Sequence, residues 1–231
     1  MKKYKVILFD ADETLFDFRQ AEKLAFSQTL EHFGIEYSDH LMQLYSQSNA
    51  ECWKLFEKGE ITKAELKIRR FSMFFSRSEL RYDPQEWNGC YIHYLSQNGI
   101  LLDGAREIID LSRKHFKICI ITNGIASVQS GRIKRAGVEH LFDHIFVSED
   151  IGVPKPDKKY FDFVFSILNC SKEECLIVGD SLSSDILGGY NYGIDTCYIS
   201  WGNAQSDKAT YTVKNLKELK DFLITLIHNN H

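Results

Sequence analysis

The sequence predicts an α/β fold: a Rossmann-like parallel sheet with helices on both faces, joined to an inserted all-helical cap domain. The apolar run Val6–Phe9 has the composition of a strand that is buried on both faces. Residues 16–96 then show helical periodicity and no convincing strand. From residue 101 onward strands and helices alternate, which is typical of a parallel sheet covered on both sides. We therefore expect a Rossmann-like core of residues 1–15 and 97–231 and a helical cap domain of residues 16–96.

The inserted segment contains several helical patterns. Thr62 and Glu65 have the spacing of a capping box and predict the start of one helix. Residues 82–95 predict another. Because the segment follows the first strand, we expect it to stand over the C-terminal edge of the sheet, as a lid does. The apolar residues expected on the inner faces of two helices are Phe26, Leu30 and Phe33, and Ala64, Ile68, Phe71 and Phe75.

The second half of the chain supplies the rest of the sheet. Asp103 and Asp157 are expected N-caps of two helices, and Gly137 is the expected end of a third. We expect strands at residues 117–121, 144–147, 175–178, 196–200 and 210–213, and helices at 105–112, 127–136 and 183–192, after Asp157, and from Asn215 onward.

Composition places the chain among ordinary soluble globular proteins, with 44% hydrophobic and 26% charged residues. The net charge is −4 and no basic run occurs, so we expect neither a nucleic-acid nor a membrane partner. The N-terminus leads directly into the first strand, and we expect no cleaved signal peptide. Six cysteines include no C-x-x-C pair, which favours buried, reduced thiols and a cytoplasmic protein.

Two acids, Asp10 and Asp12, follow the first strand directly. Like charges this close raise each other's proton affinity unless a cation lies between them. Mg²⁺ is the hard divalent ion that best fits such oxygen ligands. Open α/β folds also bind their ligands at the C-terminal ends of the strands. The pattern therefore indicates a metal-assisted reaction on an anionic substrate.

Three further polar motifs follow later in the chain. Thr122, Asn123 and Gly124 come after the strand at 117–121, and Asp180 comes after the strand at 175–178, with Asp185 five residues on. Lys155 lies between them in a loop with a proline on each side. Because the ends of parallel strands meet at one edge of a sheet, we expect these side chains to gather there.

Each acid has a chemical task in such a cluster. Asp10 can attack a phosphorus centre and form an aspartyl-phosphate. Asp12 can protonate the leaving oxygen and later deprotonate the attacking water, and its carbonyl oxygen can reach the metal. Asp180 completes the acidic metal site, with Asp185 bound through water or placed behind the ligands.

The remaining motif residues suit a phosphate. Thr122 offers a hydroxyl donor, and Asn123 and Gly124 offer backbone N–H groups to phosphoryl oxygens. Lys155 is a point positive charge for the phosphate and for Asp10. Phosphoryl transfer depends above all on charges placed in this way.

Taken together, these motifs resemble those of the haloacid dehalogenase-like hydrolases of the phosphatase type. The four family motifs match Asp10-Ala11-Asp12, Thr122, Lys155 and Gly179-Asp180-x₄-Asp185, and the resemblance covers essentially the whole chain, with a cap after the first motif. It implies a Mg²⁺-dependent phosphatase. Glu13 departs from the family pattern, because many members have glycine there.

A narrower resemblance bears on the substrate. Residues 10–18, 121–124 and 181–189 are similar to a branch that acts as pyrimidine 5′-nucleotidases on nucleoside monophosphates, and Glu13 fits that branch. The resemblance implies a nucleoside 5′-monophosphate substrate, probed by base stacking on cap aromatics. Phe18 and Trp53 are the expected contacts, and the other cap aromatics are expected to fill the cap interior. Arg69 and Arg70 can meet a ribose or carbonyl group, but a solvated face is the favoured interpretation.

Several alternatives stay open. A sugar-phosphate or other small-metabolite phosphatase, or a phosphomutase, can use the same core. A dehalogenase is disfavoured, because halide displacement has no use for the acid/base group that Asp12 supplies. A phosphoacceptor of the receiver type is also disfavoured, since such domains are about half this length and carry no helical insert. The sequence leaves open whether the chain is a monomer or a homodimer.

Overall fold

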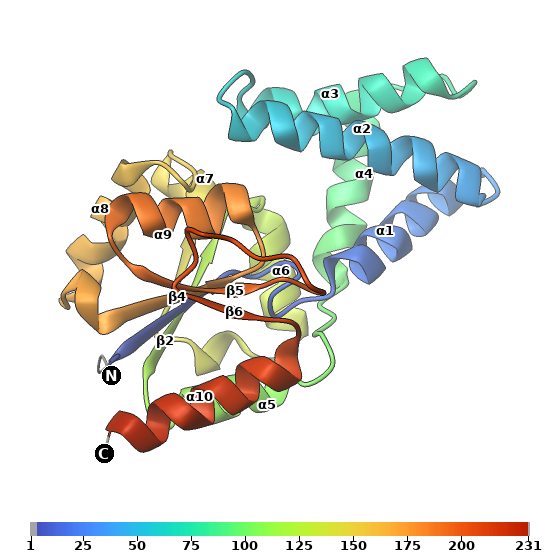
Figure 1. The fold of residues 1–231 in the computed structure, drawn as a ribbon. Coiled ribbons are helices and arrows are strands. Elements are labelled where there is room, and N and C mark those ends of the chain that lie inside the picture. Colours follow the sequence, from blue (N-terminus) through green and yellow to red (C-terminus); the bar gives the residue numbers. More distant parts are fainter. Residues whose placement is uncertain (1–3, 231) are drawn as a thin grey trace.

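A six-stranded, fully parallel sheet forms the centre of the molecule (Figure 1). The computed structural model describes residues 4–230, with side chains up to residue 228. The strand order is β3-β2-β1-β4-β5-β6, which places β1 between β2 and β4. The predicted parallel α/β fold is therefore confirmed. The strands are β1 (Val6–Phe9), β2 (Lys117–Thr122), β3 (His144–Val147), β4 (Cys175–Gly179), β5 (Asp195–Ile199) and β6 (Tyr211–Val213).

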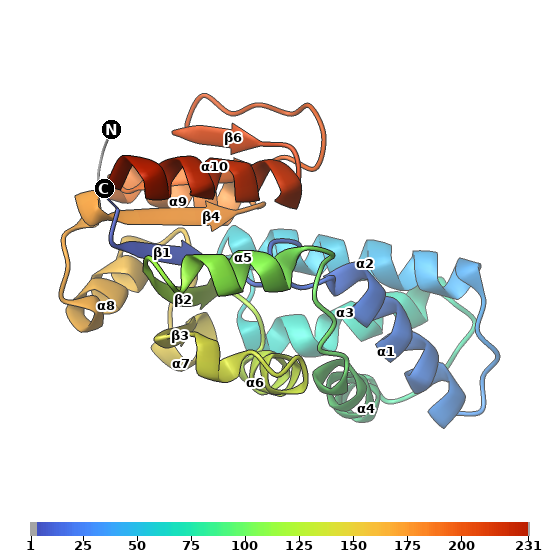
Figure 2. The ribbon, with the colours of Figure 1, turned by 90° about the horizontal axis from the view of Figure 1, so that it is seen from below.

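Helices cover both faces of this sheet (Figure 2). Successive side chains of β1 point to opposite faces, as the two-residue period of a strand requires. Ile7 and Phe9 pack in the cluster that α5 and α10 close, while Val6 and Leu8 pack in the cluster closed by α8. All four are essentially buried, which explains the continuous apolar run. These helices are α5 (Ala105–Ser112), α8 (Lys158–Leu168) and α10 (Leu216–Asn230); α9 (Leu187–Tyr192) lies beside α8.

Two local predictions in this part of the chain need correction. Gly104, not Asp103, is the N-cap of α5, because the chain enters this helix with φ +83°, where glycine is unstrained. The helix expected at residues 183–192 is divided into a π-helical segment, Leu182–Ile186, and α9. The N-cap role of Asp157 is confirmed, since its Oδ1 accepts from Lys159 N at 2.8 Å. The shorter elements are α6 (Ala126–Arg135), α7 (Ser148–Ile151) and the 3-10 turns Glu139–Leu141 and Lys172–Glu174.

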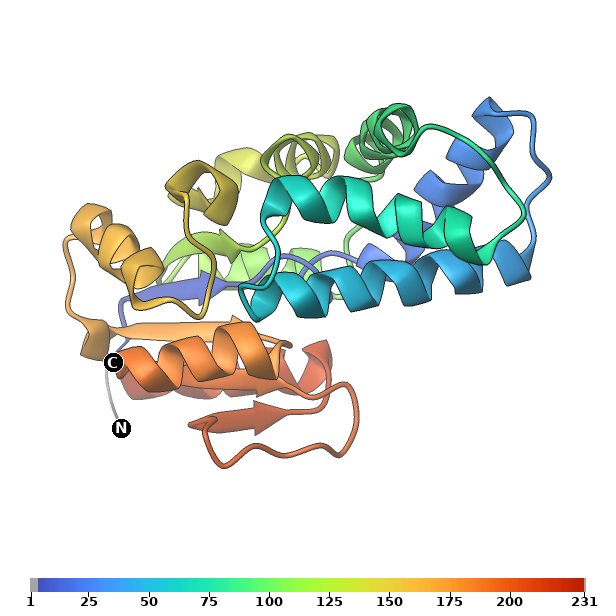
Figure 3. The same ribbon diagram turned by 90° about the horizontal axis from the view of Figure 1, so that it is seen from above.

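Four helices without a strand occupy the segment between β1 and α5, all of it within the described residues. Figures 1 and 3 show that they stand beyond the C-terminal ends of the strands, apart from the sheet. We call them the cap helices. No helix in the described part of the chain is both long and apolar enough to cross a membrane. The cap helices are α1 (Phe18–His32), α2 (Asp39–Glu57), α3 (Lys63–Arg77) and α4 (Pro84–Gln97).

The buried face of α3 differs from the expected one. The capping box of Thr62 and Glu65 is present as predicted. Ala64 is exposed and Ile68 only half-buried, however. Because α3 packs against both α2 and α4, its buried face is centred on Leu66, Arg70 and Phe74 and not on the stripe through Ala64 and Ile68. The residues that it buries are Leu66, Arg70, Phe71, Phe74 and Phe75.

Aromatic side chains fill the interior of the cap helices, as predicted. Phe26 stacks on Tyr45 with ring centroids 4.7 Å apart, and Phe33 stacks on Trp87 at 4.4 Å. The same cluster continues into α6 and its N-cap through Val128 and Ile125. The cap helices are therefore anchored to the sheet-bearing part of the molecule through α6, which packs against α4.

Candidate active site

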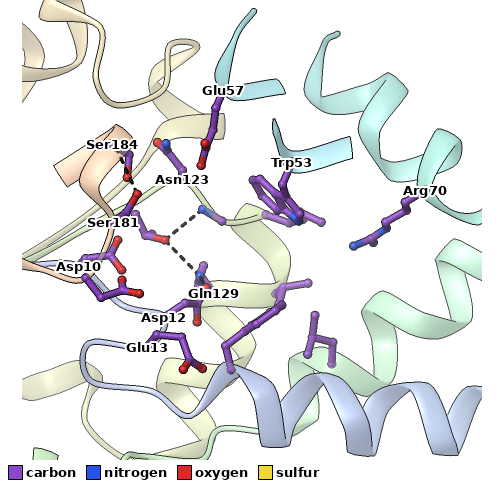
Figure 4. Close-up of a pocket in the computed structure, with 17 residues that line it drawn as sticks. Asp10, Asp12, Glu13, Trp53, Glu57, Arg70, Asn123, Gln129, Ser181 and Ser184 are labelled. Carbon is purple, nitrogen blue, oxygen red and sulfur yellow. Dashed lines mark hydrogen bonds between the residues drawn. The ribbon is translucent and has the colours of Figure 1, made fainter. Parts of the chain in front are cut away.

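A cavity of about 250 Å³ lies between the C-terminal ends of the strands and the cap helices (Figure 4). The loops that follow β1, β2 and β4 form one side of it, and α1, α2, α3 and α4 contribute to the other. Its lining residues are Asp10, Asp12, Glu13, Phe18, Trp53, Glu57, Arg70, Leu95, Thr122, Asn123, Gly124, Ile125, Val128, Gln129, Asp180, Ser181 and Ser184.

Lys155 links two of the predicted acids from beneath the cavity. Its side chain has no solvent exposure, and its Nζ donates to Asp10 Oδ1 at 2.7 Å and to Asp185 Oδ1 at 2.6 Å. A third bond, of 2.7 Å, goes to the carbonyl oxygen of Ile121. Burial works against the charge, but Asp10 and Asp185 raise the pKa of Lys155 above its ordinary value. The lysine is therefore a fixed cation.

Asp10, Asp180 and Asp185 together can hold a metal ion. One carboxylate oxygen from each lies within 4.8 Å of the others. Burial, followed by the charges of Asp10 and Asp185, raises the pKa of Asp180 to about 8. Burial raises the pKa of Asp10 to about 7, although Lys155 lowers it. The negative charge of these carboxylates is only partly offset by positive charge nearby. They form a hard, oxygen-only donor set of the kind that Mg²⁺ binds.

Asp185 is held in place by its neighbours. Its Oδ2 accepts from Ser181 N at 3.1 Å, while its Oδ1 takes the bond from Lys155. A Cβ on Gly179 would lie 2.3 Å from Asp185 Oδ2, so only glycine allows the carboxylate to lie under the end of β4. With both oxygens occupied, Asp185 is better placed to support the metal site than to face the cavity.

Asp12 is tied to two polar residues of α6 that sequence reasoning missed. Gln129 Nε2 donates to Asp12 Oδ2 at 2.7 Å and to Thr122 Oγ1 at 3.1 Å. Arg132, which has no solvent exposure, pairs with Asp12 Oδ1 through Nη1. Both residues occupy the buried face of α6, where a polar side chain needs a partner. The feature of the sequence that could have identified them was their position on the inward face of the predicted helix.

Hydrogen bonds between side chains and backbone hold the loop after β2 in place. Asn123 Nδ2 donates to the carbonyl oxygen of Lys155 at 2.8 Å, and its Oδ1 accepts from Lys155 N at 2.9 Å. Gly124 N donates to Thr122 Oγ1 at 3.0 Å. A Cβ on Gly124 would lie 2.2 Å from Gln129 Nε2, so the turn needs glycine there. Thr122, Asn123 and Gly124 all line the cavity beside Asp10, as the order of the motifs led us to expect.

Glu13 adopts a backbone conformation that explains why a glycine is common at this position. Its φ is +56°, in the left-handed region that costs other residues roughly 1–2 kcal/mol. Trp201 Nε1 donates to its carbonyl oxygen at 2.7 Å, and its Oε1 accepts from Arg19 N at 3.1 Å. These contacts hold a glutamate in a turn that glycine would adopt without strain.

The two predicted substrate contacts, Phe18 and Trp53, both line the cavity from the cap side. Lys63 lies over the Trp53 ring, with Nζ 4.4 Å from the ring centroid. The favoured interpretation of Arg70 as part of a solvated face was wrong, because its side chain is 1% exposed and lines the cavity. For Arg69 the interpretation as part of a solvated face is confirmed, because this residue is exposed.

Comparisons with known proteins agree with this arrangement. The family model described as haloacid dehalogenase-like hydrolase matches residues 7–199. The HAD-hydrolase YfnB of Bacillus subtilis is 36% identical over 227 residues, covering 96% of this chain and 97% of its own. Its crystal structure bound to magnesium superposes with a TM-score of 0.90, covering 96% of this chain and 100% of that one.

Two further relatives have named activities. The pyrimidine 5′-nucleotidase PynA of Streptococcus pneumoniae is 36% identical over 225 residues, covering 95% of both chains. The pyrimidine 5′-nucleotidase YjjG of Escherichia coli is 34% identical over 225 residues, covering 96% of this chain and 98% of its own. On the family match and on these identities, the chain belongs to the haloacid dehalogenase-like hydrolases.

Proposed function

We propose that the protein is a Mg²⁺-dependent phosphatase that hydrolyses pyrimidine nucleoside 5′-monophosphates through an aspartyl-phosphate. The observation that carries the proposal is the meeting of Asp10, Asp12, Thr122 and Asp180 at the floor of one cavity, with Lys155 behind Asp10. The activities named for PynA and YjjG support the choice of substrate.

Asp10 is the proposed nucleophile. Lys155 engages its Oδ1, which leaves Oδ2 to attack the phosphorus. A bond forms between Oδ2 and phosphorus as the bond from phosphorus to the ester oxygen breaks. Asp12 gives its proton to that leaving oxygen. Asp12 then takes a proton from water, whose oxygen attacks the aspartyl-phosphate and releases inorganic phosphate and free Asp10.

Other residues bind the phosphoryl group or the metal. The Thr122 hydroxyl and the backbone N–H of Asn123 are the proposed donors to the transferred phosphate, while Gly124 N bonds Thr122 Oγ1 and shapes the turn. Asp10, Asp180 and the carbonyl oxygen of Asp12 would hold Mg²⁺, which supplies positive charge to the phosphoryl oxygens. Asp185 supports these metal-binding residues through its hydrogen bonds with Lys155 and Ser181.

We also propose that residues 16–96 act as the cap domain over this site. Ser183 Oγ donates to Glu57 Oε2 at 3.0 Å, and Lys63 Nζ donates to the carbonyl oxygen of Asn123. Each contact joins a cap residue to a segment beside the cavity, the π-helical turn Leu182–Ile186 or the loop after β2. A cap held down in this way excludes water while the ester bond is broken.

The test is phosphate release with Mg²⁺ from a panel of phosphomonoesters. The panel holds pyrimidine and purine 5′-monophosphates in ribo and deoxy forms, several sugar phosphates and p-nitrophenyl phosphate. We expect the highest kcat/KM for pyrimidine monophosphates and no release after the metal is chelated. A preference for sugar phosphates would keep the mechanism and overturn the substrate. Release from none of them would overturn the enzymatic proposal.

A further inference from the structure

Arg70 is an unusual residue for a cavity wall made by helices. It lies on α3, its side chain is 1% exposed, and it lines the cavity with its guanidinium. Figure 4 shows the side chain directed into the cavity from the side opposite Asp10. A charged side chain buried this deeply needs partners.

The protein supplies only part of those partners. Nη2 donates to Asn88 Oδ1 at 2.9 Å and Nη1 to Asn49 Oδ1 at 3.4 Å, and both asparagines are buried. The Nε atom is buried with no hydrogen-bond partner among the described residues. A guanidinium has five N–H donors and no acceptor. The second N–H of each Nη atom is therefore left for an acceptor in the cavity, whereas Nε is buried too deeply to reach one.

Its orientation is fixed by the surrounding side chains. The guanidinium carbon lies 4.9 Å from the ring centroid of Phe71 and 4.8 Å from that of Tyr91. Asn49 connects it to a carboxylate, because Asn49 Nδ2 donates to Glu22 Oε1 at 2.8 Å. An anion bound at Arg70 would add a second negative charge near Glu22, whereas a neutral acceptor would not. The site is therefore suited to a carbonyl oxygen.

Resting on the proposed function, we propose that Arg70 determines base specificity by donating hydrogen bonds to a carbonyl oxygen of the pyrimidine ring. Asp10, which we propose to receive the reacting phosphate, lies on the opposite side of the cavity. Pyrimidine bases carry a carbonyl at C2, and uracil carries another at C4, whereas adenine carries none. Phe18, Trp53 and Leu95 line the same cavity and supply apolar surface for the ring.

The experiment compares Arg70→Lys with Arg69→Lys, its exposed neighbour on the same helix, which makes no contact with the cavity. The substrates are UMP, AMP and ribose 5-phosphate, which is the UMP skeleton without its base. For Arg70→Lys we expect the kcat/KM ratio of UMP to ribose 5-phosphate to fall about 10–100-fold, the worth of a hydrogen bond to a charged donor. The ratio of UMP to AMP should fall similarly, and Arg69→Lys should keep both ratios.

A second arm uses the wild-type enzyme and does not depend on a variant folding. Nucleotides of pyrimidin-2-one and pyrimidin-4-one each lack one carbonyl of uracil. We expect at least one of them to lose about tenfold or more in kcat/KM relative to UMP, and Arg70→Lys to erase that loss. If neither analogue loses rate, Arg70 does not recognise a base carbonyl.

The outcomes separate this inference from the proposed function. Equal losses on UMP, AMP and ribose 5-phosphate would make Arg70 a purely structural residue and overturn the inference, while UMP turnover by the wild type would keep the proposed function. A preference of the wild type for a carboxylate-bearing substrate such as 3-phosphoglycerate would assign Arg70 to an anion and overturn both. Hydrolysis of p-nitrophenyl phosphate without hydrolysis of any nucleotide would also overturn both.

Discussion

Lys155 Nζ lies 2.7 Å from Asp10 Oδ1, although the two residues are 145 positions apart in the chain. The same ammonium group bonds Asp185, so one buried cation holds two of the three carboxylates that can bind a metal. The positions of Asp10 and Asp185 in the floor of the site therefore depend on Lys155.

Replacing Lys155 with methionine should destabilise the fold and abolish turnover. The change leaves Asp10 and Asp185 buried without their cation, which typically costs about 3–5 kcal/mol. Urea unfolding at pH 7.5 measures the effect. The matched control is Lys158→Met, which breaks an exposed pair with Asp162 and should cost under about 1 kcal/mol. Equal midpoints for the two variants would contradict the role given to Lys155.

Asp10→Asn should remove turnover while the folded structure persists. An amide has the shape of the carboxylate but no anionic oxygen to attack phosphorus. Phosphate release and circular dichroism together distinguish lost chemistry from lost folding. Asp221→Asn, on the exposed side of α10, should keep full activity. A variant at Asp10 that retained most of its rate would show that another group is the nucleophile.

The floor of the site was predictable because its residues follow strands of one parallel sheet. Asp10 and Asp180 come directly after β1 and β4, and Thr122 ends β2; the three strands are neighbours in the sheet, so short-range pattern and topology suffice. Gln129 and Arg132 were not predictable in the same way. Their partner, Asp12, belongs to a loop that only tertiary packing brings over α6.

The cap was less predictable than the sheet. Helical periodicity identified α3, but it could not tell which of two adjacent arginines faces inward. The inward side of a helix with neighbours on two sides is set by their positions, and α3 lies between α2 and α4. Arg70 is therefore buried while Arg69 is exposed. The position of Arg70, which we propose to recognise the base of the substrate, depends on this packing.

Asp12→Asn should lower kcat about 10²–10⁴-fold, because the variant can neither protonate the leaving oxygen nor activate water. The loss should be smaller for p-nitrophenyl phosphate than for UMP when cleavage limits the rate, since nitrophenolate leaves without a proton. Steady-state rates on both substrates measure this difference. A loss below tenfold on UMP would argue against acid/base catalysis by Asp12.

Asp180→Asn should weaken Mg²⁺ binding at least tenfold. Burial raises the pKa of Asp180 to about 8 and that of Asp10 to about 7, so protons compete with the metal near neutral pH. The affinity of the wild type for Mg²⁺ should therefore fall as pH is lowered from 8 to 6, and less steeply in the variant. Isothermal titration calorimetry at the two pH values tests both effects. Unchanged affinity would remove Asp180 from the metal site.

Glu22→Gln should stabilise the protein above neutral pH and leave it unchanged in acid. Burial raises the pKa of Glu22 from 4.5 to about 7, although Arg70 and Asn49 lower it. The folded state therefore binds the proton more tightly than the unfolded state, so the free energy of unfolding falls as pH rises from 4.5 to about 7. At about 1.4 kcal/mol per pKa unit, the variant should gain about 1–3 kcal/mol at pH 8.

Urea unfolding at pH 5 and pH 8 measures this gain in the free energy of unfolding, with Glu31→Gln on the exposed side of α1 as control. Parallel stability curves for wild type and Glu22→Gln would mean that Glu22 stays ionised in the fold and balances the charge of Arg70 throughout.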